Sequence, residues 1–109
     1  MVRTIPLQFT ITGTEIHIPF KAMCSITEKP FSGVVRIAYR PQKKAVEYVD
    51  MEKVVNTLCR GKLTAEQLTH RIYKDVKRSI RPKSLCVTVD VKKSAAHRPV
   101  TVWIDDKSN

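Results

Sequence analysis

Residues 23–41 read MCSITEKPFSGVVRIAYRP and place a cysteine between two runs in which apolar and polar residues alternate. Such alternation predicts strands, and the second run, residues 34–39, is closed by Pro41. A core cysteine lies inside an apolar pattern, whereas Cys24 lies at the end of one, on a polar turn. A substrate could reach a thiol in this position. We therefore take the Cys24 turn as the candidate site and the rest of the chain as its scaffold.

Alternating runs elsewhere in the chain predict further strands. Residues 4–11 and 15–20 alternate on either side of Gly13, which predicts an antiparallel hairpin. Three later runs are read as strands in the same way: a short one at 45–49, then 84–93 and 100–104. Each long run has one apolar and one polar face, as expected for an antiparallel sheet that is wet on one side.

Two helices are predicted between these strands. Asp50 is expected to be the N-cap of a helix over residues 51–60, with Gly61 as its C-terminal stop. Thr64 and Gln67 have the spacing of a capping box, which predicts the start of a second helix. Both helices carry an apolar stripe that needs a partner. The sequence therefore predicts an α+β fold, an antiparallel sheet with two helices packed on one face.

The composition indicates a small basic protein. The chain has 109 residues, which predicts one domain over residues 1–109, and no apolar run suggests a membrane span. Three cysteines without a CxxC pair, and three histidines without ligand spacing, indicate neither a disulfide framework nor a metal site. We therefore expect a reduced, cytoplasmic setting. The net charge of +10 favours a polyanionic partner, most commonly nucleic acid, although a solvated basic surface is the alternative.

A row of basic residues follows the second helix on a face other than its apolar stripe. Contacts of such residues with phosphates would give a salt-dependent affinity for nucleic acid. The alternative for each residue is a solvated helix surface. The candidates for such phosphate contacts are Arg71, Lys74, Lys77, Arg78, Arg81 and Lys83.

Residues 24–30, CSITEKP, resemble the C-P-V-T-G-Q-P-D motif of the QueF family, the nitrile reductases that act on 7-cyano-7-deazaguanine. Cys24, Thr27 and Pro30 match the motif directly. The match continues without a gap through residues 35–41, where the family has an alternating strand closed by proline. The resemblance extends over most of residues 20–91. It implies the tunnelling fold, in which small two-helix, antiparallel-sheet units assemble into rings.

Glu66 falls where this family keeps a glutamate that reads the base. The resemblance thus implies that the Glu66 carboxylate accepts hydrogen bonds from a guanine-like edge. The alternative is a glutamate that merely favours the N-terminus of a helix, an effect of a few tenths of a kcal/mol.

The chain departs from the reductases where they bind NADPH. Their pattern E-[S/L]-K-[S/A]-x-K falls on residues 47–52, where Val49 and Glu52 replace both lysines. A nicotinamide phosphate needs cationic or backbone donors, so this departure implies that no cofactor is bound. Losing these contacts while keeping the cysteine and the glutamate is the pattern of the QueF-like archaeal enzymes. Those enzymes add ammonia to the nitrile of 7-cyano-7-deazaguanine in transfer RNA, giving the amidine of archaeosine.

The resemblance therefore implies a transfer-RNA-modifying amidinotransferase in a cyclic homo-oligomer, a pentamer or stacked pentamers, with ammonia as nitrogen donor. Cys24 would attack the nitrile carbon and form a covalent thioimidate. The nitrile nitrogen must gain protons, but the motif's catalytic aspartate is replaced by Phe31. Glu28, Ser25, a bound water or the substrate itself could supply them.

Two other functions stay open. An NADPH-dependent nitrile reductase predicts a nicotinamide site, against which the two replaced lysines argue. A basic, non-catalytic RNA-binding module on the same fold predicts that Cys24→Ala leaves the function intact and that no thioimidate forms.

Overall fold

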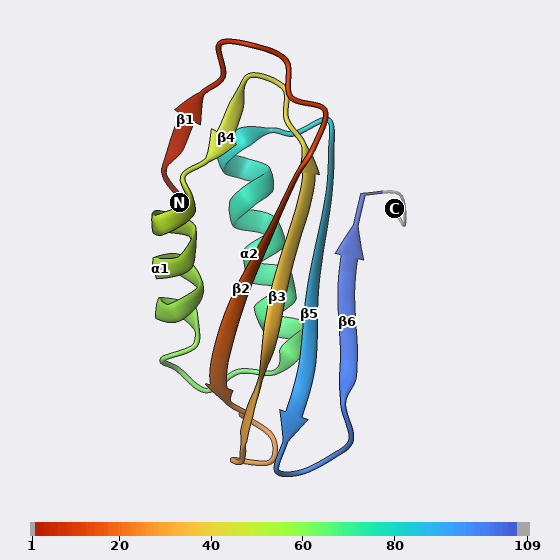
Figure 1. The fold of residues 1–109 in the computed structure, drawn as a ribbon. Helices are drawn as coiled ribbons and strands as arrows, with labels where there is room; N and C mark the ends of the chain where they lie inside the picture. Colours follow the sequence, from red (N-terminus) through yellow and green to blue (C-terminus); the bar gives the residue numbers. More distant parts are fainter. Residues whose placement is uncertain (1, 107–109) are drawn as a thin grey trace.

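The computed structural model describes residues 2–106 (Figure 1). The strands β2, β3, β5 and β6 form one antiparallel sheet in the order β2-β3-β5-β6, and β1 pairs with β4 in a separate two-stranded sheet. The predicted α+β class is confirmed. The elements are β1 (Thr4–Pro6), β2 (Thr14–Met23), β3 (Pro30–Arg40), β4 (Lys44–Val46), α1 (Tyr48–Leu58), α2 (Ala65–Ile80), β5 (Ser84–Ser94) and β6 (Val100–Asp105).

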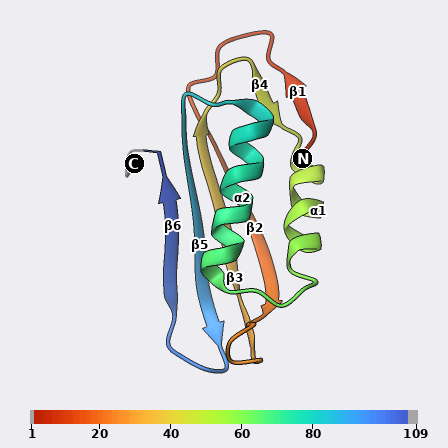
Figure 2. The same cartoon turned by 180° about the vertical axis from the view of Figure 1, so that it is seen from behind.

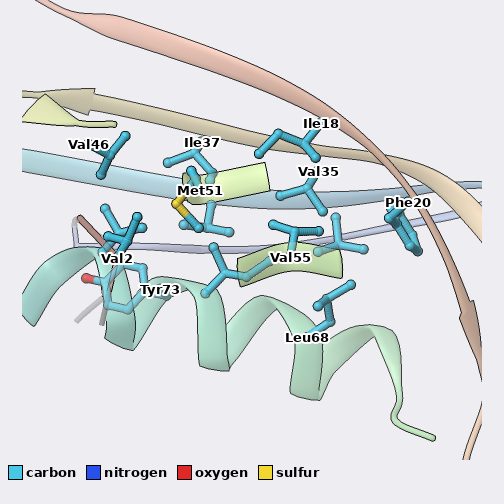
Figure 3. Packing of buried hydrophobic residues seen from close by; sticks show 14 of the residues in the cluster. Val2, Ile18, Phe20, Val35, Ile37, Val46, Met51, Val55, Leu68 and Tyr73 are labelled. Carbon is cyan, nitrogen blue, oxygen red and sulfur yellow. The ribbon is translucent and has the colours of Figure 1, made fainter. Parts of the chain in front are cut away.

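Both helices lie on one face of the four-stranded sheet, as Figures 1 and 2 show from opposite sides. The apolar residues of the alternating runs face the helices, and Val35, Ile37, Val55 and Leu68 are fully buried between the two layers (Figure 3). Removing such side chains from water contributes about 1.5–3 kcal/mol each. The polar positions of the same strands remain on the uncovered face. No helix in the described part of the chain is long and apolar enough to cross a membrane.

The predicted hairpin between residues 4–11 and 15–20 is wrong. β1 ends at Pro6 and pairs with β4, while β2 pairs with β3 along its whole length. Proline has no N–H with which to continue a strand ladder. The alternation in residues 4–11 also does not reflect burial, since Phe9 is 72% exposed.

α1 begins earlier than predicted, at Tyr48, so the strand expected at residues 45–49 is confined to β4. The N-cap is Glu47 instead of Asp50, because the Glu47 carboxylate accepts a hydrogen bond from the backbone N–H of Asp50 (3.0 Å). The Asp50 carboxylate accepts from the backbone N–H of Arg3 (2.6 Å). This bond ties the start of the chain to the helix.

The prediction is wrong for the end of α1 but confirmed for the start of α2. The stop at Gly61 is wrong, because α1 ends before it with Cys59 as C-cap. The capping box is confirmed: the Thr64 hydroxyl accepts from the N–H of Gln67 (3.1 Å), and the Gln67 side chain accepts from the N–H of Thr64 (3.0 Å). This box fixes where α2 begins and therefore places Glu66 in its first turn.

Candidate functional site

Cys24 lies on the turn between β2 and β3, as predicted. The N–H of Cys24 donates to the carbonyl of Lys29 (3.0 Å), and the N–H of Glu28 donates to the carbonyl of Cys24 (2.9 Å). Glu28 has a φ of 55°, in the left-handed region that favours glycine, and the motif that this turn resembles has glycine there. The Glu28 carboxylate forms an ion pair with Lys62. These contacts hold the turn in one conformation and bind it to the loop before α2.

Backbone hydrogen bonds also join the Cys24 turn to that loop. The N–H of Leu63 donates to the carbonyl of Met23 (3.0 Å), and the N–H of Ser25 donates to the carbonyl of Leu63 (3.4 Å). Leu63 is only 1% exposed, so the loop is anchored in the core. Because α2 starts at the next residues, its first turn lies against the cysteine.

A pocket of about 390 Å³ opens between the Cys24 turn, the start of α2 and the loop between β5 and β6. Its polar lining comprises Cys24, Thr27, Glu66 and His97 among the described residues, together with the capping residue Thr64. The two site residues predicted from sequence, Cys24 and Glu66, therefore share one pocket. The remaining wall is made of Ile26, Phe31, Ala65, Val91 and Val100.

The electrostatics of the pocket favour the thiolate of Cys24. A hydrogen bond from the Thr27 side chain is the largest cause that lowers the pKa of this thiol, with further help from the backbone at Thr27 and Ile26. Partial burial and the negative charge of Glu66 oppose the lowering. In contrast, burial raises the pKa of Cys59 to about 11, so that thiol stays protonated near neutral pH. Since the thiolate is the nucleophile, Cys24 is the better placed of these two cysteines to react.

The lowered pKa makes the substitution Thr27→Val informative. Removing the hydroxyl removes the largest stabilisation of the thiolate, so the pKa of Cys24 is expected to rise. At a pH below that pKa, alkylation by iodoacetamide should slow, and the pH profile of the rate should move to higher pH. Mass spectrometry of the Cys24 peptide measures this rate.

The matched control for this variant is Thr88→Val, which removes the hydroxyl that lies 3.8 Å from the sulfur of Cys86. This control should leave the Cys24 profile unchanged. An unchanged profile in Thr27→Val would show that Thr27 does not tune the thiol.

The basic residues predicted to bind transfer RNA lie elsewhere. None of Arg71, Lys74, Lys77, Arg78, Arg81 and Lys83 lines the pocket with Cys24. They follow α2 and the loop after it toward the end of the helix remote from that pocket (Figure 2). A helix of 16 residues spans roughly 24 Å. All six residues are exposed, and the Lys77 ammonium lies 5.3 Å from the ring centre of Tyr73.

His97 is the pocket residue that the sequence did not point to. Its Nδ1 lies 2.7 Å from the carbonyl oxygen of Arg98, and since that oxygen only accepts, Nδ1 carries the hydrogen in this geometry. His97 sits in the loop before β6, where spacing alone carries no signal of a pocket. Within residues 2–106, no group of three or more His, Cys, Asp or Glu side chains is arranged to hold a metal ion.

The sequence profile of the GTP cyclohydrolase I family matches residues 12–101, a range that contains Cys24, Glu66 and His97. The chain belongs to the GTP cyclohydrolase I family. It is 33% identical over 95 residues to GTP cyclohydrolase 1 of Fusobacterium nucleatum, and 31% identical over 88 residues to that of Campylobacter concisus. These alignments cover 87% and 77% of this chain but 49% and 46% of the relatives. The chain therefore spans about half the length of these members of the GTP cyclohydrolase I family.

Among solved structures, this member of the GTP cyclohydrolase I family matches the crystal structure of the archaeosine synthase QueF-Like in the apo form. The TM-score is 0.80 at 18% sequence identity, and the match covers 89% of this chain and 95% of that one. The likeness shows the fold. The expected tunnelling fold is therefore confirmed, and the resemblance to the QueF-like enzymes holds at the level of architecture.

Proposed function

We propose that this chain is a transfer-RNA-modifying amidinotransferase, which converts the nitrile of 7-cyano-7-deazaguanine in transfer RNA to the formamidine of archaeosine with ammonia. The observation that carries the proposal is the pocket shared by Cys24 and Glu66, in which the pKa of the thiol is lowered. The extent of the matches also supports the proposal. The structural match covers 95% of the QueF-Like chain, whereas the sequence alignments cover only about half of the two GTP cyclohydrolase 1 relatives. The net charge of +10 suits an RNA substrate.

The proposed reaction has two steps at one carbon. The Cys24 thiolate attacks the nitrile carbon, a C–S bond forms, and the nitrile nitrogen takes up a proton, which gives a thioimidate. Ammonia then attacks the same carbon, the C–S bond breaks with its electron pair returning to sulfur, and the amidine is released. The sum is the addition of one ammonia to one nitrile. No electrons are gained or lost, so the reaction needs neither NADPH nor another hydride donor.

We assign the proton transfer to His97. The other side chains considered for it, Glu28 and Ser25, do not line the pocket, and Glu28 is paired with Lys62. Phe31, which replaces the motif's aspartate, packs edge-on against an aromatic ring of the core, with centroids 5.7 Å apart. An imidazole ring can both donate and accept a proton, and the carbonyl of Arg98 holds the His97 ring by Nδ1, which leaves Nε2 for the substrate.

His97→Gln is expected to lower kcat roughly 100-fold, the ordinary contribution of one acid–base group, while the affinity for transfer RNA stays the same. Steady-state kinetics and RNA binding measure the two effects separately. His70→Gln, the same change on the exposed side of α2, should behave as the unmodified protein. Full turnover by the His97 variant would contradict this role.

A cyclic homo-oligomer, a pentamer or stacked pentamers, with its sites at subunit interfaces, belongs to the same proposal. The sheet order leaves β2 and β6 as edge strands of the four-stranded sheet. The unpaired backbone N–H and C=O groups of an edge strand can form hydrogen bonds with an edge strand of a neighbouring subunit.

The experiment that tests the function incubates transfer RNA carrying the 7-cyano base with the protein and either ammonium or NADPH, followed by digestion and nucleoside mass analysis. An amidine nucleoside with ammonium alone is the expected product. An aminomethyl nucleoside with NADPH would instead identify a nitrile reductase. No product, combined with tight, salt-sensitive RNA binding, would identify a non-catalytic module. Turnover of GTP would instead indicate that this chain has the GTP cyclohydrolase activity for which its relatives are named.

A further inference from the structure

A second pocket, of about 590 Å³, lies where β2, β3 and β5 meet the end of α1. Four cationic side chains line it and, among the described residues, no carboxylate does. They are Lys21 of β2, Arg60 after α1, and Lys92 and Lys93 of β5, and we call the site they line the basic pocket. The end of α1 lies beside β2 in both ribbon views (Figures 1 and 2), so a residue after the helix reaches the edge of the sheet.

The register of the sheet places three of these side chains in one pocket. Lys21 is paired with Ser32, and Ser32 is paired with Lys93, so the three residues stand side by side across β2, β3 and β5. A β-bulge follows, since the next pair is Gly33 with Val91 and Lys92 is left without a partner in β3. A bulge re-aims side chains, and here the neighbours Lys92 and Lys93 both line the basic pocket.

The bulge depends on the glycine in β3. A Cβ atom at Gly33 would lie 1.9 Å from the carbonyl oxygen of Asp90, closer than any side chain tolerates. The close approach of the two backbones lies at the register shift that leaves Lys92 without a partner in β3. The stretch of sequence that carries the cysteine thus also carries the residue that shapes the basic pocket.

The charges in the basic pocket are only partly compensated. The Asp90 carboxylate lies 2.8 Å from the Lys92 ammonium and neutralises it. Within residues 2–106, Lys21, Arg60 and Lys93 form no ion pair. Three exposed cations therefore face one pocket without a counter-charge, which is the arrangement expected where an anionic ligand supplies it.

A smaller hollow, of about 350 Å³, lies next to both the basic pocket and the Cys24 pocket. It shares Lys21, Ser32 and Lys93 with the basic pocket, and it shares Phe31 with the Cys24 pocket. Two of the uncompensated cations, Lys21 and Lys93, thus line a hollow that adjoins the Cys24 pocket at Phe31. The basic residues of α2 run in the other direction, toward the far end of the helix.

We propose that Lys21, Arg60 and Lys93 bind phosphate groups of the RNA strand whose modified base enters the Cys24 pocket. The inference rests on the proposed function and adds the site at which the RNA backbone is held. Each phosphodiester carries one negative charge, and a lysine or arginine that neutralises it releases counterions. Such contacts position the strand and make its affinity depend on salt.

The test compares two variants of the full chain that lower its net charge by the same three units. One carries Lys21→Gln, Arg60→Gln and Lys93→Gln, and the other carries Arg71→Gln, Lys74→Gln and Arg78→Gln on α2. Both are titrated against fluorescently labelled, unmodified transfer RNA at several salt concentrations. Unchanged thermal melting and Cys24 alkylation confirm that each variant is folded. The RNA affinity is measured by anisotropy.

The pocket variant is expected to bind roughly tenfold more weakly or worse, with the slope of log Kd against log salt reduced by about 2–3. The α2 variant, changed at residues predicted from the sequence to contact RNA, is expected to lose clearly less affinity. Equal losses in both variants, or a larger loss in the α2 variant, would overturn the inference. Binding is measured without the nitrile reaction, so the two proposals fail separately. If the unmodified protein forms the amidine but the pocket variant binds RNA as well as it does, the role of the basic pocket alone is refuted. If the pocket variant loses RNA binding but the unmodified protein forms no amidine, the proposed function alone is refuted.

Discussion

Replacing Cys24 by alanine is expected to abolish amidine formation, with a loss of roughly 10⁴-fold or more in kcat. The reason is chemical: without the thiol no thioimidate forms, and ammonia would have to attack the nitrile unaided. Turnover of transfer RNA carrying the 7-cyano base, measured by nucleoside mass, gives the rate. Cys24→Ser serves as a second variant of nearly the same shape, and it should be equally inactive, because a hydroxyl is far less acidic than a thiol.

The chain supplies its own controls for this prediction. Cys59, whose pKa burial raises to about 11, and Cys86, on the polar face of β5, lie outside the Cys24 pocket. Cys59→Ala and Cys86→Ala should retain activity if they fold, which thermal melting checks. Activity retained in Cys24→Ala would contradict the covalent mechanism. Loss of stability in Cys24→Ser and Cys24→Ala alike, with activity lost only in proportion to unfolding, would mark Cys24 as a structural thiol.

Glu66→Gln is expected to lower kcat/KM roughly 100-fold, which corresponds to about 3 kcal/mol of lost hydrogen bonding to a charged group. The same change should lower the pKa of Cys24 further, because the Glu66 charge is one of the causes that raise it. Alkylation of Cys24 at a fixed pH below the pKa should therefore become faster while turnover becomes slower. These opposite changes separate base recognition from damage to the site.

The alternative role of Glu66, a carboxylate that only favours the N-terminus of α2, makes a different prediction. It gives a small loss of stability, a few tenths of a kcal/mol, and unchanged kcat/KM. Glu52→Gln, on an exposed position of α1, is the matched control and should leave both alkylation and turnover as they are. Unchanged kcat/KM in Glu66→Gln would remove this residue from substrate binding.

Local patterns predicted much of the fold. The strict alternation of residues 84–93 identified β5, and the Thr64–Gln67 pair identified the start of α2, because both signals lie within one element. Strand pairing was predicted less well. Residues 4–11 alternate like a strand, yet β1 pairs with β4, a choice made by contacts distant in sequence and limited by Pro6.

The candidate site, too, could be predicted only in part from local patterns. The position of Cys24 on a turn followed from alternation, but Glu66 became a candidate only through the QueF resemblance. What brings the two into one pocket is the backbone pairing of Leu63 with Met23, a tertiary contact without a sequence signal. His97 lies on a loop, and the bulge at Lys92 interrupts an otherwise regular strand, so neither could be recognised before the chain was folded.

A thioimidate between Cys24 and the substrate base can be trapped when the nitrogen donor is withheld. Transfer RNA carrying the 7-cyano base is incubated with the protein in the absence of ammonium. The RNA is then digested with nuclease and the protein with trypsin, and the masses of the peptides are measured by mass spectrometry. The Cys24 peptide is expected to gain the full mass of the bound nucleoside, because addition to the nitrile loses no atoms, and added ammonium is expected to release the nucleoside as the amidine. If the amidine forms with ammonium but no adduct at Cys24 is detected at any time before the product appears, the covalent mechanism is wrong.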